Sequence, residues 1–289
     1  MTTIKAEAPA KINLTLEVLR RMSNGFHKLR MVVLKIPDLK DELEFQIQPG
    51  VRKIIIKCDN PEIPLDERNI CHKAVNVFLD KLKKEVEISI KIKKKIPVGA
   101  GLSGGSSDAA VTFLALNKYF NKPFLRKDLI KMASSVGKDV PFFFSSKRGA
   151  LVEGSGEKIR KKFDFSEGCF LIVNPRINIS TKEAYGQLSK DIWFMKNKDR
   201  TNISENLIKA LKSGNNFEKY FYNDFEMTVE KKYPVIKEIK QALLAFGAEG
   251  ALMSGSGSTV FGYFKSFEKA EIVRKIIQKH YGDFLVVVG

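Results

Sequence analysis

The order of hydrophobic and polar positions predicts a chain of mixed strands and helices. Near the start, Ile12, Leu14 and Leu16 alternate with polar residues, which is the two-residue period of a half-buried strand. Further strands are expected at 31–36, 42–48, 53–57 and 86–92, and helices at 69–83, 106–120 and 128–136. Apolar residues lie nearly all round the helix at 106–120, so we expect it to be buried between other elements. Asp128 is expected to cap the helix at 128–136, and Gly137 to end it.

The pattern changes beyond about residue 160. Strands are expected at 169–173 and 284–288, helices at 203–211, 233–246 and 266–279, and a Gly/Ser-rich loop at 250–262. Strands and helices mix without regular strand-helix-strand alternation, which predicts an α+β fold. Since a length of 289 residues also suits two domains, we expect one at 1–160 and one at 161–289.

Composition predicts a folded protein with an unusual charge. Hydrophobic residues make up 44% and charged residues 29% of the chain, which excludes intrinsic disorder as the dominant state. The 50 Lys and Arg against 33 Asp and Glu give a net charge of +17. Such an excess favours polyanionic partners, namely nucleic acid, an anionic membrane surface or a phosphorylated small substrate. A lysine-rich surface without a specific partner gives the same number, so composition leaves all four open.

The cysteines and the lack of long apolar stretches indicate in which cellular compartment the protein is expected. Cys58, Cys71 and Cys169 are odd in number and far apart, which fits neither a disulfide framework nor a zinc knuckle. Residues 1–16 lack the apolar core of a signal peptide, and no stretch reaches the ~18 apolar residues of a membrane helix. We therefore expect a cytoplasmic protein with no membrane partner.

The candidate chemistry lies in a glycine-rich loop at 97–108, PVGAGLSGGSSD, between a predicted strand and the buried helix. Glycines let backbone N–H groups approach an anion, and the positive end of a helix dipole favours phosphate at the same place. The stretch matches G-x-G-x-x-G, but no acidic ribose ligand follows at 117–123. Gly105 stands where a P-loop has lysine, and neither H-R-D nor D-F-G occurs in the chain. A tight packing turn is the alternative to a phosphate cradle.

Three segments resemble the motifs of the GHMP kinase superfamily, whose members transfer the γ-phosphoryl group of ATP to small metabolite alcohols. They are 8–14 (APAKINL), 97–110 (PVGAGLSGGSSDAA) and 253–258 (MSGSGS), in the order of the family. Within the superfamily, 25–27 (GFH) and 137–143 (GKDVPFF) resemble the 4-diphosphocytidyl-2-C-methyl-D-erythritol kinases of the non-mevalonate route to isoprenoid precursors.

The resemblance implies an ATP-dependent kinase that phosphorylates the tertiary 2-hydroxyl of this cytidine diphosphate substrate. It also implies the two-domain GHMP kinase fold, α+β throughout. The N-terminal, ATP-binding domain is then of the ribosomal protein S5 domain 2 type, and the active site lies in the cleft between the domains.

The resemblance assigns two catalytic residues. Asp139 matches the base that accepts the alcohol proton, and Lys11 matches the catalytic lysine. A lysine ammonium beside Asp139 would favour the carboxylate form of the base. The alternative for Asp139 is an ordinary aspartate in the turn after a helix, and without the motif around it Lys11 would be interpreted as a solvated strand lysine.

Five substrate contacts also follow from the resemblance. Phe26 and Tyr185 match the aromatic rings on the two faces of the cytosine, and His27 then reads its edge. Asn13 is expected near the tetritol hydroxyls and Thr181 near the diphosphate. The family usually has Tyr where this chain has Phe26, so stacking is kept and a phenol hydrogen bond is lost. Alone in a turn, His27 also reads as a surface residue.

The ATP is expected along the glycine-rich loop, with its triphosphate at the N-terminus of the helix that follows. The matching residues are Pro97, Val98, Gly99, Ala100, Gly101, Leu102, Ser103, Gly104, Gly105, Ser106 and Ser107, with Asn69 on the adenine side. Ser103 stands where many relatives have Gly. Mg²⁺ is expected to bridge the β- and γ-phosphates, with the Ser107 hydroxyl as its candidate protein ligand. Residues 255–258 are expected to support the loop from the second domain.

Two other functions stay open. Another GHMP kinase, acting on homoserine or mevalonate, needs no aromatic pair for cytosine. A basic nucleic-acid-binding protein on an S5-like fold would use runs such as 91–95. Against it, Lys91 and Lys93 alternate with isoleucines, as on one solvated strand face. We expect a monomer or weak homodimer without a nucleic-acid partner.

Overall fold

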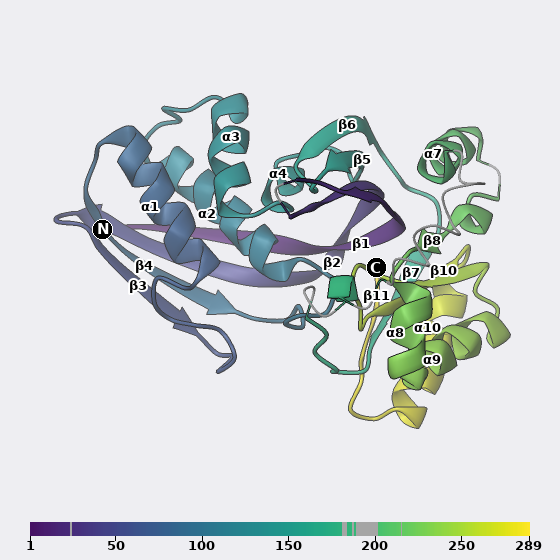
Figure 1. Cartoon of the computed structure of the whole chain (residues 1–289). Helices are drawn as coiled ribbons and strands as arrows, with labels where there is room; N and C mark the ends of the chain where they lie inside the picture. Colours follow the sequence, from purple (N-terminus) through teal and green to yellow (C-terminus); the bar gives the residue numbers. More distant parts are fainter. Residues whose placement is uncertain (24, 181–183, 187, 189–201, 215) are drawn as a thin grey trace.

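The computed structural model describes the whole chain except residues 24, 181–183, 187, 189–201 and 215. Two β-sheets organise the described residues (Figure 1). The strands of the first sheet are β1 (Thr2–Arg21), β2 (His27–Pro49), β3 (Lys53–Cys58), β4 (Val86–Lys93), β5 (Gly149–Gly154), β6 (Lys158–Phe163) and β8 (Tyr222–Asn223). Those of the second sheet are β7 (Cys169–Asn174), β9 (Gly250–Met253), β10 (Val260–Phe264) and β11 (Leu285–Val288).

The first sheet is built on two long antiparallel strands. It has the order β3-β4-β2-β1-β8, with β5 pairing with β2 and β6 with β5. The strands expected at 31–36 and 42–48 are both parts of β2. Register shifts interrupt the β1-β2 pairing between Pro9 and Ala10 and between Asn13 and Thr15. These irregularities lie on either side of Lys11, where a bulge can turn a side chain away from the regular alternation.

The prediction of a half-buried first strand is wrong, because its polar side chains are also buried. Asn13 is 1% and Glu17 2% exposed. On that face helix α7 (Ile203–Ser213) covers the strand, and Ser204 donates its backbone N–H to Glu17 at 3.2 Å. The Thr15 and Ser204 hydroxyls lie 2.7 Å apart. Alternation separates apolar from polar residues, but it does not reveal that the polar ones find partners inside the fold.

Three helices cover one face of the first sheet (Figure 1): α1 (Ile70–Leu82), α2 (Gly104–Tyr119) and α3 (Arg126–Val136). The expected burial of α2 is confirmed, since most of its side chains are buried. The end of α3 at Gly137 is confirmed too. Its expected cap is wrong: the helix begins at Arg126, and Asp128 lies in the first turn, where its carboxylate accepts the backbone N–H of Leu125 at 3.2 Å. The single-turn helix α4 (Val140–Phe143) follows.

The second sheet has the order β11-β7-β10-β9 and packs with α9 (Pro234–Ala245) and α10 (Phe267–His280), while α8 (Glu226–Lys232) precedes α9. The loop expected at 250–262 is shorter, because it includes β9 and the start of β10, which pair with each other. Sequence reasoning did not foresee β5, β6, β8 and α8. The domain boundary expected at 160 falls inside β6 and stays a prediction. Among the described residues, no helix has the length and apolar character needed to cross a bilayer.

Candidate active site

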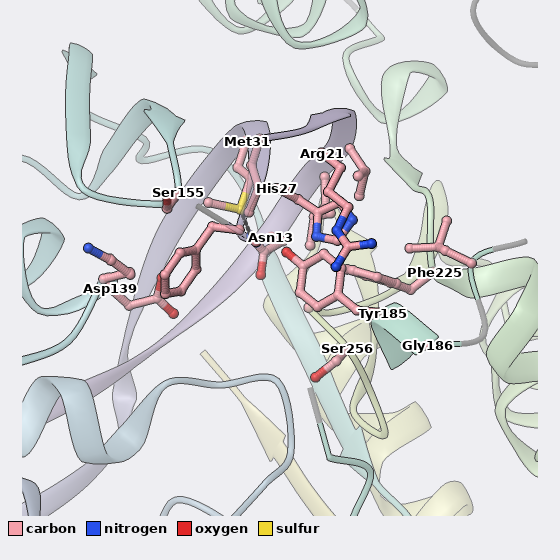
Figure 2. A pocket seen from close by; sticks show the side chains of 18 of the residues that line it. Asn13, Arg21, His27, Met31, Asp139, Ser155, Tyr185, Gly186, Phe225 and Ser256 are labelled. Carbon is pink, nitrogen blue, oxygen red and sulfur yellow. Dashed lines mark hydrogen bonds between the residues drawn. The ribbon is translucent and has the colours of Figure 1, made fainter. Parts of the chain in front are cut away.

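A cavity of about 1080 Å³ is lined by residues from both halves of the chain. It runs along the β1 side chains Lys11, Asn13 and Arg21. In the view of Figure 2, Asp139 and Ser155 lie at one end and Tyr185 with Phe225 at the other, with Asn13 between them. Predicted residues of four different motifs, together with Tyr185, therefore face one space: Lys11, Asn13, Phe26, His27, Ser106, Asp139 and Tyr185.

Lys11 is buried, with 5% of the residue exposed. Its ammonium donates to Asn13 Oδ1 at 2.5 Å and to the carbonyl oxygen of Gly101 at 2.9 Å. Burial lowers the pKa of Lys11, and the negative charge of Asp139 opposes that shift. Among the described contacts, the partners of the ammonium are thus Asn13 and the glycine-rich loop, while Asp139 acts on it through its field. Asn13 Nδ2 in turn lies 3.4 Å from the sulfur of Met31.

Asp139 stands immediately before α4 and points into the cavity (Figure 2). Its Oδ2 accepts a hydrogen bond from the hydroxyl of Ser103 at 2.5 Å. Gly156 lies against its other oxygen, since a Cβ on that glycine would come within 3.1 Å of Oδ1. Loop 97–103 and the segment that holds Asp139 therefore meet directly at the cavity.

The far end of the cavity is aromatic. The His27 and Tyr185 rings stack with centroids 4.5 Å apart and an interplanar angle of 15°, and Phe225 meets Tyr185 edge-on at 4.8 Å. Phe26 is 52% exposed and lies nearer the opposite end, under the ammonium of Lys138, the residue before Asp139, 5.5 Å from its ring centroid. The expected cytosine pair, Phe26 and Tyr185, lines the same cavity, but it is the His27 ring that stacks on Tyr185. Burial and the Arg21 charge lower the pKa of His27, and burial raises the pKa of Tyr185.

The glycine-rich loop packs against the turn at 254–259 in the second sheet, as expected. Gly101 has φ +75°, and a Cβ on it would meet the carbonyl oxygen of Ser254 at 2.1 Å, so only glycine allows this approach. The Ser254 hydroxyl donates to the Gly101 carbonyl at 3.1 Å. The predicted support of the loop by the second half of the chain is confirmed.

Two predicted nucleotide-side residues differ in their surroundings. Asn69 caps α1, since its Oδ1 accepts the Cys71 N–H at 2.8 Å while its Nδ2 donates to the Pro64 carbonyl at 2.7 Å. Both polar atoms of the Asn69 side chain are thus hydrogen-bonded to backbone groups. Its contact with the adenine stays a prediction. Ser107 lies in the first turn of α2, fully buried, and its hydroxyl has no hydrogen-bond partner among the described residues. Within that part of the chain, no group of three His, Cys, Asp or Glu side chains is arranged to hold a metal ion.

Several cavity residues were not foreseen, and Thr181 lies outside the described residues. Arg21 lies on β1 and Met31 on β2. The alternation of side chains along these strands, next to the motifs, could have identified both as lining residues. Ser155 and Phe225 carry no motif, and long-range packing alone brings them to the cavity. These unforeseen lining residues include Leu16, Val18, Arg21, Leu29, Met31, Lys138, Ser155, Gly186, Leu188, Phe225 and Ser256.

Comparisons with known families agree with this geometry. The family model of the GHMP kinases N terminal domain matches residues 69–147, and that of the GHMP kinases C terminal domain matches residues 205–283. The first range includes the glycine-rich loop and Asp139, and the second includes the supporting turn.

Relatives and solved structures narrow the family. The 4-diphosphocytidyl-2-C-methyl-D-erythritol kinase of Clostridium kluyveri is 39% identical, over 97% of this chain and 98% of its own. That of Syntrophus aciditrophicus is 37% identical, over 96% and 95%. A crystal structure of 4-(cytidine 5'-diphospho)-2C-methyl-D-erythritol kinase superposes with a TM-score of 0.80 at 28% identity, covering 99% of this chain and 98% of that one. A homoserine kinase from Cytophaga hutchinsonii reaches 0.78 at 20% identity, covering 100% and 94%, which shows the shared fold alone.

Proposed function

The chain belongs to the 4-diphosphocytidyl-2-C-methyl-D-erythritol kinase family of GHMP kinases, and from this premise we propose how its cavity performs the phosphoryl transfer. The enzyme uses ATP to phosphorylate the 2-hydroxyl of 4-diphosphocytidyl-2-C-methyl-D-erythritol. One observation carries the proposal: Lys11 and Asp139 face the same cavity whose far end holds the His27 and Tyr185 rings.

Asp139 acts as the base. The substrate hydroxyl loses its proton to the Asp139 carboxylate while its oxygen attacks the γ-phosphorus of ATP, and the bond to ADP breaks. Lys11 supplies positive charge beside the transferring group, and its fixed acceptors, Asn13 Oδ1 and the Gly101 carbonyl, hold it there. Because burial lowers the pKa of Lys11, the charge of Asp139 supports the ammonium form that this role requires.

The aromatic end binds the cytosine. Tyr185 offers a ring braced edge-on by Phe225, and Phe26 supplies a second, more exposed ring of the same cavity, beside Lys138. The His27 ring stacks on Tyr185, so a base that stacks on this face of Tyr185 must displace it. His27 then reads the base edge, while Asn13 binds the tetritol and Thr181 the diphosphate.

The glycine-rich loop and the α2 N-terminus bind the ATP phosphates through residues 97–107, with Asn69 toward the adenine. Mg²⁺ fits at this place because the buried Ser107 hydroxyl has no partner among the described residues and can serve as a ligand. When bound, the ion neutralises charge on the β- and γ-phosphates. With three unpaired cysteines we place the enzyme in the cytoplasm, as a monomer or weak homodimer without a nucleic-acid partner.

Coupled ADP release with three substrates tests the proposal. We expect turnover with 4-diphosphocytidyl-2-C-methyl-D-erythritol and little with homoserine or mevalonate, although the homoserine kinase fold is almost equally similar. Asp139→Asn should lower kcat by about 10²–10⁴-fold, the contribution typical of a general base. Asp164→Asn, on an exposed aspartate paired with Lys147, is the control and should keep wild-type turnover. Preferred turnover of homoserine, or an active Asp139→Asn, would contradict the assignment.

A further inference from the structure

Ser103 occupies a backbone conformation that disfavours it. It has φ +54° and ψ +34°, the left-handed region that favours glycine over residues with a Cβ. It also directly precedes α2, where a serine normally accepts an N–H of the first helical turn with its hydroxyl. Ser103 makes no such capping bond. Neither the backbone nor the helix end therefore explains a serine at this position.

The hydroxyl of Ser103 is directed to Asp139 instead, donating to its Oδ2 at 2.5 Å. Asp139 precedes α4 and does not cap that helix with its side chain either. Gly156, which has φ +120°, packs on the Oδ1 side of the same carboxylate, where a Cβ would come within 3.1 Å of Oδ1. The carboxylate is thus held through Oδ2, while Oδ1 makes no hydrogen bond among the described contacts, and Asp139 lines the cavity.

We propose that Ser103 is a positioning residue that fixes the Asp139 carboxylate so that Oδ1 accepts the substrate proton. The inference rests on the proposed role of Asp139 as the base. In the transfer step the substrate proton moves to Oδ1, and the Ser103 hydroxyl keeps its own proton throughout. Because Ser103 belongs to the loop that binds ATP, it also links the placement of the base to the nucleotide site.

Two substitutions separate the hydroxyl from the backbone. Ser103→Ala removes the hydroxyl and keeps the strained backbone, so we expect kcat to fall about tenfold, with KM for ATP and for the cytidyl substrate changed less than about twofold. Ser103→Gly should lose the same activity while its melting temperature rises by about 2 °C, since glycine relieves the conformation. Lys83→Gly is the matched control: Lys83 has φ +55° at the exposed end of α1, so Tm should rise with kcat unchanged.

A second measurement does not depend on turnover. Melting temperatures of Ser103→Ala, Asp139→Asn and the double variant form a cycle, in which a direct contact gives non-additive changes. Additive changes, or an unchanged kcat in Ser103→Ala, would overturn the proposal. A raised KM for ATP with intact kcat would also overturn it, because the hydroxyl would then be a phosphate ligand. If the wild type does not act on the cytidyl substrate, the proposed function fails, and this cycle still decides the contact.

Discussion

Lys11 has unusual surroundings for a lysine on a strand. A lysine on a strand normally extends its ammonium to water, whereas this one is buried and binds an amide oxygen and a loop carbonyl. The motif around Lys11 identified it as a candidate and the structure places it on the cavity, but the motif did not indicate its partners. Those partners come from β1 itself, through Asn13, and from the glycine-rich loop, through Gly101, which lies far along the chain.

How well the site could be predicted depends on where its residues stand in the chain. Lys11, Phe26 and Asp139 lie in compact motifs, so local sequence identifies them. The Ser103–Asp139 hydrogen bond joins two motifs, and neither motif predicts where the other lies in the fold. Phe225 belongs to no motif and reaches the cavity through long-range packing. Contacts between motifs can be identified only once the fold is known.

His27 gives a prediction with a definite sign. Burial and the positive charge of Arg21 lower the pKa of His27, so the ring is neutral at pH 7 and gains its charge only at a lower pH than an ordinary histidine. Protonation changes the hydrogen-bonding pattern of the ring, and we expect KM for the cytidyl substrate to rise as pH falls. In Arg21→Met the pKa of His27 should rise, so that this increase in KM begins at higher pH.

The pH midpoint of KM, measured for wild type and Arg21→Met, is the readout. Arg21 also lines the cavity, so its loss can change KM at every pH, but only the field effect moves the midpoint. KM for ATP, measured in parallel, should show no such shift. Equal midpoints in the two proteins would show that Arg21 does not control the charge of His27.

At the scale of elements, β4 and α2 are joined beneath the glycine-rich loop by a buried ionic cluster of Asp41, Lys94 and Asp108. Lys94 pairs with Asp41 and, at 2.9 Å, with Asp108 Oδ2. Asp41 Oδ1 also accepts the backbone N–H groups of Lys95 and Ile96, at 2.6 and 2.9 Å. The cluster therefore fixes the residues just before the glycine-rich loop to β2, and Lys94 to the first turns of α2.

Asp108 makes the stability of the chain depend on pH. Burial raises its pKa from 3.8 to about 7, against the attraction of Lys94, so folding takes up a proton between these values. A group with a raised folded pKa stabilises below its unfolded pKa and loses that contribution as pH rises through the folded one. The free energy of unfolding should thus fall between about pH 4 and pH 7, by at most about 1.4 kcal/mol per unit from this group.

Asp108→Asn should flatten that slope, and urea unfolding across this pH range measures it. The matched control is Asp80→Asn, on an exposed aspartate that pairs with Arg52, which should keep the wild-type slope. A slope equal in wild type and Asp108→Asn would show that the cluster stays fully ionised.

Helices and strands were largely predictable from the sequence where a single hydrophobic periodicity, of a helix or of a strand, dominates the segment. Helices α1 and α10 and strands β4 and β7 follow clear periodicities, and their predicted and observed bounds differ by at most a few residues. The failures have physical causes. β1 is irregular around Asn13 and buries polar residues, while Asp128 supports its helix from the first turn and not from the cap. Short elements such as α8 and β8 carry too few residues to show a period.

At the scale of the molecule, the net charge of +17 is not a continuous basic surface along β4. Lys93 and Lys95 both pair with Glu42, and Lys94 is buried in its cluster. A polyanion approaching this strand therefore meets acidic as well as basic side chains. Lys11, Lys138 and Arg21 line the cavity instead and place positive charge along it, with Lys11 buried.

The contact between the two sheets depends on a glycine. Gly101→Ala places a Cβ on the Ser254 carbonyl and strains a residue at φ +75°, so we expect the free energy of unfolding to fall by about 2–5 kcal/mol. Gly214→Ala is the control, because it meets the same backbone strain at φ +66° with its nearest neighbouring atom 3.9 Å away, and should cost only about 1–2 kcal/mol. Urea unfolding of both variants separates the clash from the strain.

The clash in Gly101→Ala should also lower activity, because the Gly101 carbonyl accepts a hydrogen bond from the Lys11 ammonium. If Ser254 is pushed away, the loop moves with it, and Lys11 and the ATP phosphates lose their alignment. We expect kcat/KM for ATP to fall in Gly101→Ala and to stay at the wild-type value in Gly214→Ala. Equal unfolding costs with unchanged activity would mean that the second half of the chain does not support the nucleotide loop.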